Sequence, residues 1–144
     1  MQLKVKKLRA DARLPVYSTL NAAGADLYAC LDADVTIPPH GTAMIGTGLA
    51  FEIPVGYGGF VYARSGIASR RGLAPANKVG VIDADYRGEL IVSLHNQSDE
   101  PQTVAKNERV AQLVIAPYLK VDFTESEDLS ATDRGAGGFG STGQ

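Results

Sequence analysis

The sequence has 144 residues, of which 44% are hydrophobic and 21% charged, with a net charge of −2. This length and balance predict one folded domain, and they exclude a disordered chain and a protein that coats nucleic acid through a basic excess. Cys30 is the single cysteine, which excludes an intrachain disulfide, and no apolar run has the length of a membrane span. We therefore expect a cytoplasmic protein without membrane or nucleic-acid partners.

Short apolar runs broken by Gly and Pro predict strands along most of the chain. Alternation favours a strand over residues 3–8, and apolar runs favour strands over 35–37, 43–53, 58–63, 79–82, 90–94 and 110–115. The polar stretch 83–89 indicates a hairpin between two of these strands. Ser65 is expected to cap a short helix over 66–71 that ends at Gly72. This pattern predicts an all-β sandwich, barrel or jelly roll.

The chain beyond residue 121 has a different composition. Residues 122–133 are acidic and rich in Ser and Thr, and five of the nine residues from 135 to 143 are Gly. Because such a segment loses much entropy on ordering, we expect a folded domain over 1–121 and a flexible Gly-rich C-terminal arm over 122–144. Arg134, Phe139 and Ser141 suit a phosphate and a base, so the arm is interpreted as a lid over a nucleotide.

The stretch 77–89 places a carboxylate and an aromatic ring beside an apolar strand. Asp83 follows that strand directly, where an ionised carboxylate can orient water. Tyr86 is suited to packing against a flat ring or a sugar. A calcium loop is excluded, since Arg87 and Leu94 stand where that loop requires ligands.

Three further polar positions are candidates for binding. Arg64 stands before the expected helix start, which is typical either of a simple turn or of an anion site. Asp26 is expected to satisfy turn amides or an arginine. Gln112 interrupts an apolar strand, so its side chain faces either solvent or a ligand.

Taken in order, these motifs resemble the five motifs of the trimeric deoxyuridine triphosphatases. The matching segments are Ala-Gly-x-Asp-Leu at 23–27, Arg-Ser-Gly at 64–66, Asn-x-x-Gly-x-Ile-Asp-x-Asp-Tyr-Arg-Gly at 77–88, Glu-Arg-x-Ala-Gln at 108–112, and Arg-Gly-x-Gly-Gly-Phe-Gly-Ser-Thr-Gly at 134–143. The resemblance covers nearly the whole chain. It implies a distorted jelly-roll subunit and a homotrimer with shared active sites. It also implies Mg²⁺-dependent hydrolysis of dUTP to dUMP and pyrophosphate, which limits uracil in DNA and supplies dUMP for thymidylate synthesis.

The resemblance also implies roles for individual residues. Asp83 would be catalytic, activating the attacking water and holding the deoxyribose 3′-hydroxyl. Asp26 would orient an arginine or a metal-bound water, and Mg²⁺ would be held by substrate phosphates and waters without a direct protein ligand. The implied substrate-binding residues are Arg64, Ser65 and Gly66 for phosphates, Asn77, Gly80, Val81 and Ile82 for uracil, Tyr86 for the sugar, Gln112 for water or the α-phosphate, and Arg134, Phe139, Gly140 and Ser141 in the arm.

Two positions depart from the family pattern, and two other functions stay open. Ala63 replaces a frequent Pro, and Asn107 replaces a usual Gly; because Asn tolerates positive φ, the turn at Asn107 is expected to survive. One alternative is a dCTP deaminase-like enzyme, which the chain resembles in its expected fold. Deaminases of that type carry a catalytic Glu at the position that Ser93 occupies in this chain. The other is a non-catalytic trimeric jelly-roll binding module.

Overall fold

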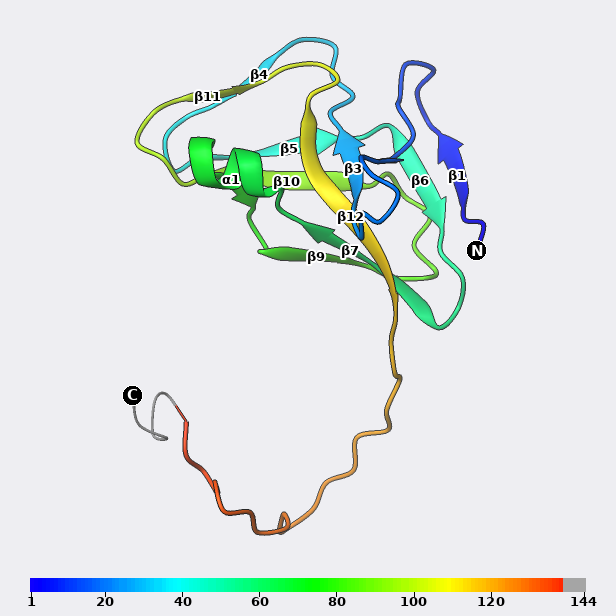
Figure 1. The fold of residues 1–144 in the computed structure, drawn as a ribbon, viewed down its shortest axis with the longest axis vertical. Coiled ribbons are helices and arrows are strands. Elements are labelled where there is room, and N and C mark those ends of the chain that lie inside the picture. The colour runs from blue at the N-terminus through cyan, green and yellow to red at the C-terminus, as the bar shows by residue number, and fades with distance from the viewer. Residues whose placement is uncertain (139–144) are drawn as a thin grey trace.

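The computed structural model describes residues 1–138. Short strands form a twisted β body with one helix on its side, and the C-terminal segment leaves this body (Figure 1). The elements are β1 (Lys4–Lys7), β2 (Val16–Tyr17), β3 (Ala25–Tyr28), β4 (Val35–Ile37), β5 (Thr42–Gly46), β6 (Leu49–Glu52), β7 (Tyr57–Tyr62), α1 (Ser65–Arg71), β8 (Leu73–Pro75), β9 (Val79–Ile82), β10 (Ile91–Asn96), β11 (Gln102–Val104) and β12 (Arg109–Pro117). The prediction of an all-β fold with one short helix is confirmed.

The strands form antiparallel sheets around one apolar core. The largest sheet has five strands in the order β2-β3-β12-β7-β9, and a three-stranded sheet has the order β5-β10-β8. The pairs β1-β6 and β11-β4 complete the body. Alternate residues of β10 point inward, which is the period-two pattern of a strand with one buried face. The largest fully buried side chains come from both larger sheets, from the pairs and, for Leu90, from the residue before β10: Leu27, Ile37, Ile45, Leu49, Leu73, Leu90 and Leu94.

The predicted hairpin around residues 83–89 is wrong, although both of its strands exist. β9 pairs with β7, whereas β10 pairs with β5 and β8. Residues 83–90, called the crossover segment below, therefore run from the five-stranded to the three-stranded sheet. The backbone of Leu90 directs this path, because its N–H donates to Leu49 O at 2.8 Å and its C=O accepts from Thr47 Oγ1 at 2.7 Å. Alternation predicts a strand but carries no information about the strand's partner.

The short helix begins one residue earlier than predicted. It begins at Ser65, and Arg64 is the N-cap residue, with extended backbone (φ −87°, ψ 128°) and no side-chain capping bond. Ser65 is therefore not the cap, because it is already helical. The predicted end is confirmed: Gly72 has φ 67° and donates its N–H to the carbonyls of Ile67 and Ala68.

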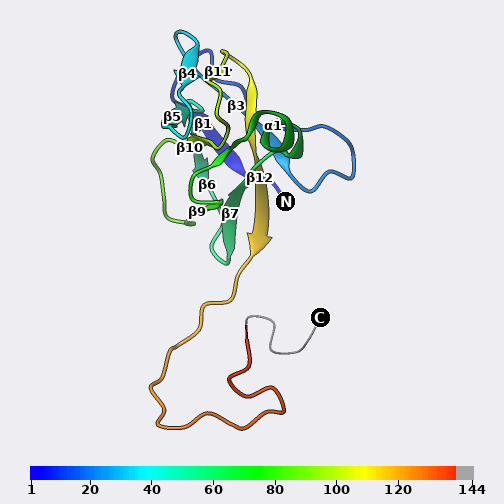
Figure 2. The same ribbon diagram turned by 90° about the vertical axis from the view of Figure 1, so that its left-hand side faces the viewer.

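Two backbone features frame the C-terminal part. Asn107, in the turn before β12, has φ 63°, so the turn expected at this position is present. After β12, residues 118–138 contain no helix or strand and are almost all exposed. Figures 1 and 2 show this segment extending away from the β body in both views. No helix within residues 1–138 is long and apolar enough to cross a membrane.

Candidate active site

One cavity of about 350 Å³ gathers three of the sequence motifs. It is lined by Ser18, Ala22, Ala23, Gly24, Asp26, Arg64, Ser65, Gly66 and Gln112, and is called the Asp26 cavity below. The motifs meet because β12 pairs with β3 on one side and with β7 on the other. In this register Gln112 lies opposite both Asp26 and Tyr62, and Arg64 follows two residues beyond Tyr62.

Asp26 is the buried charge at the centre of this cavity. It is 5% exposed. Its Oδ1 accepts from Arg64 Nε at 2.7 Å, and its Oδ2 accepts from Ser18 Oγ at 2.8 Å and from an Arg109 terminal nitrogen at 3.2 Å. Burial alone would raise the pKa of Asp26, but the hydrogen bonds from Ser18 and Arg64 outweigh it and hold this pKa below its usual value. Asp26 thus contacts an arginine, which is one of the two roles considered for it.

The side chain of Gln112 lines the Asp26 cavity and is held there by a main-chain carbonyl. Its Nε2 donates to Ala63 O at 2.9 Å. Gly24 leaves room for the amide, because a Cβ there would lie 2.3 Å from Gln112 Oε1. The contact to Ala63 uses the main-chain carbonyl, so the departure from Pro at this position does not affect it.

Asp83 lies in a different and larger cavity. This Asp83 cavity, of about 970 Å³, also contains Val81 and Ile82 of β9 and has a mostly apolar lining. Part of that lining is Tyr118, Leu119, Val121 and Phe123, which follow β12. Several of these apolar side chains are strongly exposed: Val81 is 62%, Leu119 91% and Phe123 95% exposed.

The two cavities are at opposite ends of the β7-β9 pair. Ile82 pairs with Gly59, so Asp83 lies beside the start of β7, whereas Arg64 follows the end of β7. At roughly 3.3 Å per residue, the two positions are about 20 Å apart. A catalytic base must lie within one hydrogen bond, or one bridging water, of the group on which it acts. In one chain, therefore, Asp83 and Arg64 cannot act on the same phosphate.

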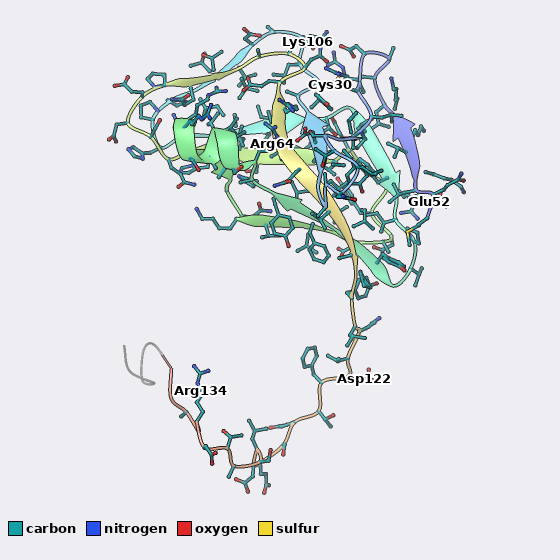
Figure 3. All side chains as sticks on the ribbon, in the orientation of Figure 1. Cys30, Glu52, Arg64, Lys106, Asp122 and Arg134 are labelled. Carbon is teal, nitrogen blue, oxygen red and sulfur yellow. The ribbon has the colours of Figure 1, made fainter. Side chains whose placement is uncertain are left out.

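The remaining predicted residues surround β9 or lie in the arm. The Asn77 amide nitrogen comes within 3.4 Å of the position that a Cβ on Gly80 would occupy. The Tyr86 hydroxyl donates to Glu89 O at 3.0 Å, and the Tyr86 side chain is 46% exposed. Arg134 Nε donates to Gly137 O at 2.8 Å. Figure 3 shows Arg134 in the C-terminal segment, away from Arg64 in the β body. Phe139, Gly140 and Ser141 lie outside the described residues.

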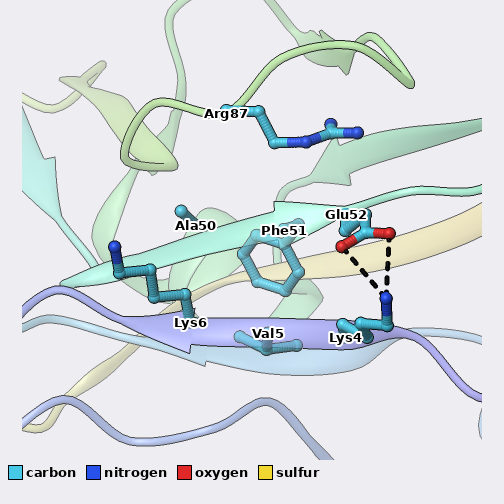
Figure 4. A pocket seen from close by; sticks show the side chains of 7 residues that line it. All are labelled: Lys4, Val5, Lys6, Ala50, Phe51, Glu52 and Arg87. Carbon is cyan, nitrogen blue, oxygen red and sulfur yellow. Dashed lines mark hydrogen bonds and ion pairs between the residues drawn. The ribbon is translucent and has the colours of Figure 1, made fainter.

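A third groove, of about 400 Å³, contains none of the predicted site residues. It runs along β1 and β6 beneath Arg87 and is lined by Lys4, Val5, Lys6, Ala50, Phe51, Glu52 and Arg87 (Figure 4). Lys4 Nζ and Glu52 Oε1 are 3.2 Å apart in a pair that is largely exposed to solvent. Such pairs contribute little to stability or affinity, so this groove is not a candidate active site.

Within residues 1–138, no group of three His, Cys, Asp or Glu side chains is arranged to hold a metal ion. Asp26 already has arginine and serine partners on both oxygens. That Mg²⁺ arrives with phosphates and water stays a prediction.

Sequence reasoning missed Gly24 and Ser18, which line the Asp26 cavity, and Arg109, which donates to Asp26. Arg109 and Gly24 were inside quoted motifs, and an arginine in such a motif could have been proposed as a partner of the carboxylate. Ser18 carries no such signal, because a single hydroxyl in a loop is common. Directly beside Asn77, Lys78 has a φ of 64°, which places a non-glycine residue in the left-handed region.

A family model described as dUTPase matches residues 10–143. The chain belongs to the dUTPase family. The deoxyuridine 5'-triphosphate nucleotidohydrolase of Nautilia profundicola is 51% identical over 144 residues and the two chains cover each other completely. The protein of the same name from Hydrogenobaculum sp. is 50% identical over 143 residues, covering 99% of each chain. The family prediction is therefore confirmed.

Solved dUTPase structures share the fold of this chain. A mutant dUTPase of Staphylococcus bacteriophage 80alpha, with dUpNHpp, has a TM-score of 0.86 at 31% identity and 99% coverage of both chains. A mutant dUTPase from phage phi11 of S. aureus, described with a structural Mg(II) ion, has a TM-score of 0.78 at 27% identity, covering 89% of this chain and 98% of the other. The jelly-roll-like subunit predicted from the sequence is confirmed.

Proposed function

We propose that this chain hydrolyses dUTP to dUMP and pyrophosphate, acting on the cytoplasmic nucleotide pool and thereby limiting uracil in DNA and supplying dUMP for thymidylate synthesis. The observation that carries the proposal is the pair of complementary half-sites in a dUTPase-family fold. Asp26 fixes Arg64 beside Ser65, Gly66 and Gln112 in one cavity, and Asp83 directly follows the edge strand β9 in another. The family match and the relatives' names favour this reaction over the deaminase-like and non-catalytic alternatives.

In this mechanism Asp83 is the general base. Its carboxylate takes a proton from water as the water oxygen bonds to the α-phosphorus, and the bond from that phosphorus to the bridging oxygen breaks to release pyrophosphate. Such a displacement requires alignment and charge neutralisation more than covalent help from the protein. Asp83 meets the first need because its backbone is fixed at the end of β9, next to the paired residue Ile82.

Arg64, Ser65 and Gly66 form the phosphate half of the site. The Nε of Arg64 is bound to Asp26, which leaves the terminal N–H groups of the same guanidinium for phosphate oxygens. Gln112, fixed through Ala63 O, is placed to bind water or the α-phosphate. The arginine is oriented before substrate arrives, so binding does not have to order it.

The free edge of β9 provides recognition of uracil. β9 is the last strand of the five-stranded sheet, so one side of its backbone pairs with β7 and no strand within residues 1–138 pairs with the other side. The edge of uracil presents alternating acceptors and a donor, which the backbone of Gly80, Val81 and Ile82 can match. Asn77 adds a side-chain amide, and the exposed ring of Tyr86 packs under the deoxyribose and leaves no space for a 2′-hydroxyl.

A homotrimer with shared active sites supplies what one chain lacks. Asp83 and Arg64 are too far apart within a chain, and in this proposal Asp83 of one subunit acts with Arg64 of another. The exposed apolar side chains in the Asp83 cavity support contact with a second copy, since such patches are uncommon on free surfaces. A closed ring of subunits repeats this contact at every interface.

Mg²⁺ is expected to reach this site bound to the phosphates of the substrate. Mg²⁺ keeps several waters and is commonly bound through substrate phosphates, so it does not require a cluster of carboxylates. When bound, it supplies positive charge to the triphosphate. The chain's own part is to hold the phosphates with Arg64 and to orient that arginine with Asp26.

We further propose that residues 1–121 form the catalytic domain and that residues 122–144 close over the nucleotide. Arg134 would grip the γ-phosphate with Ser141 and Gly140, and Phe139 would stack on uracil. A truncation before Arg134 is expected to lower kcat/KM for dUTP while the remaining chain folds normally. Unchanged kcat/KM would show that the arm takes no part.

The first experiment tests the reaction. The protein is incubated with Mg²⁺ and, separately, with dUTP, dCTP, dTTP and UTP, and products are separated by chromatography. We expect dUMP and pyrophosphate from dUTP alone. Formation of dUTP from dCTP would establish the deaminase-like activity instead, and no turnover by a folded trimer would favour the binding module.

The second experiment tests the shared site by mixing two inactive variants. Asp83→Asn and Arg64→Ala homotrimers are each expected to be inactive. After denaturation and joint refolding, random assembly gives about a quarter of the sites an intact Asp83 from one chain and an intact Arg64 from another. Recovery of activity supports the shared site. If mixed trimers form but stay inactive, each site is confined to one chain.

A further inference from the structure

The Glu89 carboxylate is seated on the turn between β5 and β6. Gly48 N–H donates to Glu89 Oε1 at 2.7 Å. Gly46 leaves the space for this oxygen, because a Cβ there would lie 2.6 Å from it. Gly48 has φ 66°, a backbone conformation that favours glycine. Two glycines thus form a fitted seat for one carboxylate at the end of the crossover segment.

The rest of the crossover segment is closed upon itself. An Arg87 terminal nitrogen donates to Ala84 O at 2.6 Å and to Tyr86 O at 3.0 Å, and Tyr86 N–H donates to Asp83 O at 3.2 Å. The Tyr86 hydroxyl donates to Glu89 O at 3.0 Å. Among the described residues, every hydrogen bond of residues 84–88 stays within 83–89. We therefore expect this segment to behave as one unit that carries both Asp83 and Tyr86.

Glu89 joins this unit to the body. Figure 4 shows Arg87 projecting from the crossover segment above Phe51 of β6, the strand that directly follows Gly48. Ala84 packs against the edge of the core, but an apolar contact is not directional. The Glu89–Gly48 hydrogen bond is directional, and it lies at the opposite end of the unit from β9.

We propose that Glu89 is a positioning residue for the reaction, setting the place of Asp83 and Tyr86 through its seat on the Gly48 N–H. This inference rests on the proposed function. Removing the carboxylate leaves the unit attached directionally only through β9 and the backbone of Leu90. Displacements of about 1 Å at a reacting group can cost 10²-fold in rate. Because Tyr86 moves with Asp83, sugar selection changes together with the rate.

Four variants separate positioning from folding. Glu89→Ala removes the acceptor, and Glu89→Gln keeps an acceptor oxygen on a side chain of the same length. Gly46→Ala leaves Glu89 intact but places a methyl group against its oxygen. Glu52→Ala is the matched control. It makes the same change at Glu52 of β6, which forms a solvent-exposed ion pair with Lys4.

Variants that disrupt the contact between Glu89 and Gly48 are expected to change the kinetics, and the control variants are not. Glu89→Ala and Gly46→Ala lower kcat/KM for dUTP by about 10- to 100-fold and narrow the preference for dUTP over UTP. Glu89→Gln stays within about threefold of the parent chain, as does Glu52→Ala. The double variant Gly46→Ala/Glu89→Ala is no worse than Glu89→Ala alone, since both changes disrupt one contact.

Hydrogen exchange followed by mass spectrometry gives a readout that does not depend on activity. In Glu89→Ala, but not in Glu52→Ala, amides of residues 84–90 and of Gly48 should exchange faster while the core strands remain protected. If the parent chain does not hydrolyse dUTP, the proposed function fails, and the exchange pattern still decides whether Glu89 anchors the segment. Unchanged exchange, or a loss of rate that only follows the fraction of folded protein with dUTP preference intact, would overturn the inference.

Discussion

Replacing Asp26 with Asn tests whether the buried carboxylate organises the phosphate half of the site. The change keeps the shape, but one carboxylate oxygen becomes an NH₂ group that faces a donor. Oδ1 serves Arg64 and Oδ2 serves Ser18 and Arg109, so one side must lose its acceptor. A hydrogen bond to a buried charge contributes about 1.5–3 kcal/mol. Arg109 is 48% exposed, which weakens its share, so we expect a loss of about 3 kcal/mol.

The stability difference between the parent chain and Asp26→Asn should depend on pH in a defined direction. The folded-state pKa of Asp26 lies below the reference value of 3.8, because its hydrogen bonds outweigh burial. A lowered carboxyl pKa stabilises the folded state above the unfolded-state pKa, and that contribution is lost as the pH falls through the folded-state pKa. The difference in unfolding free energy between the parent chain and Asp26→Asn should therefore be full at pH 7 and shrink below about pH 3.8.

Urea denaturation at several pH values, at fixed protein concentration, measures this difference, and steady-state kinetics measure the effect on Arg64. We expect kcat/KM for dUTP to fall at least about tenfold, because an arginine without its partner no longer holds one orientation. Asp99→Asn is the control, since that carboxylate is 95% exposed and, among residues 1–138, pairs only with His40. Equal urea midpoints for Asp26→Asn and the parent chain at pH 7, or a gap that persists unchanged in acid, would refute the reasoning.

Three further substitutions have defined outcomes. Asn107→Ala should destabilise the chain by about 1 kcal/mol in urea denaturation while Asn107→Gly does not, because only Ala is strained at φ 63°. Gly24→Ala should lower kcat/KM for dUTP about tenfold by displacing Gln112, whose Oε1 lies 2.3 Å from the new Cβ; unchanged kinetics would show that Gln112 is dispensable. Gly88→Ala would place a Cβ 2.4 Å from the Tyr86 hydroxyl, so UTP hydrolysis should rise relative to dUTP, and an unchanged ratio would contradict the sugar-packing role.

Much of the strand content was predictable, because alternation and apolar runs are local signals. The errors arise where non-local contacts decide. Residues 43–53 looked like one strand, but Thr47 and Gly48 form a turn that binds the backbone of Leu90 and the side chain of Glu89. β3 was missed because its four residues are all buried and include Asp26, so it shows neither alternation nor a continuous apolar run. The charge becomes acceptable there only once Ser18, Arg64 and Arg109 are in place around it.

For the candidate site, too, local features were predictable from the sequence and non-local contacts were not. Residue types and the order of motifs predicted which side chains carry function, but not which of them meet. Arg64 and Asp83 are close in the sequence, yet the antiparallel pairing of β7 with β9 places them at opposite ends. Asp26 and Gln112 are distant in the sequence and meet because β3 and β12 are neighbours. Strand pairing is the information that a single sequence does not display.

In the proposed trimer, both half-sites are organised before the subunits meet. The phosphate half is organised within one chain, since Arg64 and Gln112 have their partners there. The nucleoside half is likewise fixed in one chain through β9 and the Glu89 seat. Association then has only to bring two ordered halves together, so little conformational entropy is lost at the site. Dilution below the dissociation range of the proposed trimer should therefore abolish activity while both halves keep their hydrogen-exchange protection, and concentration alone should restore it.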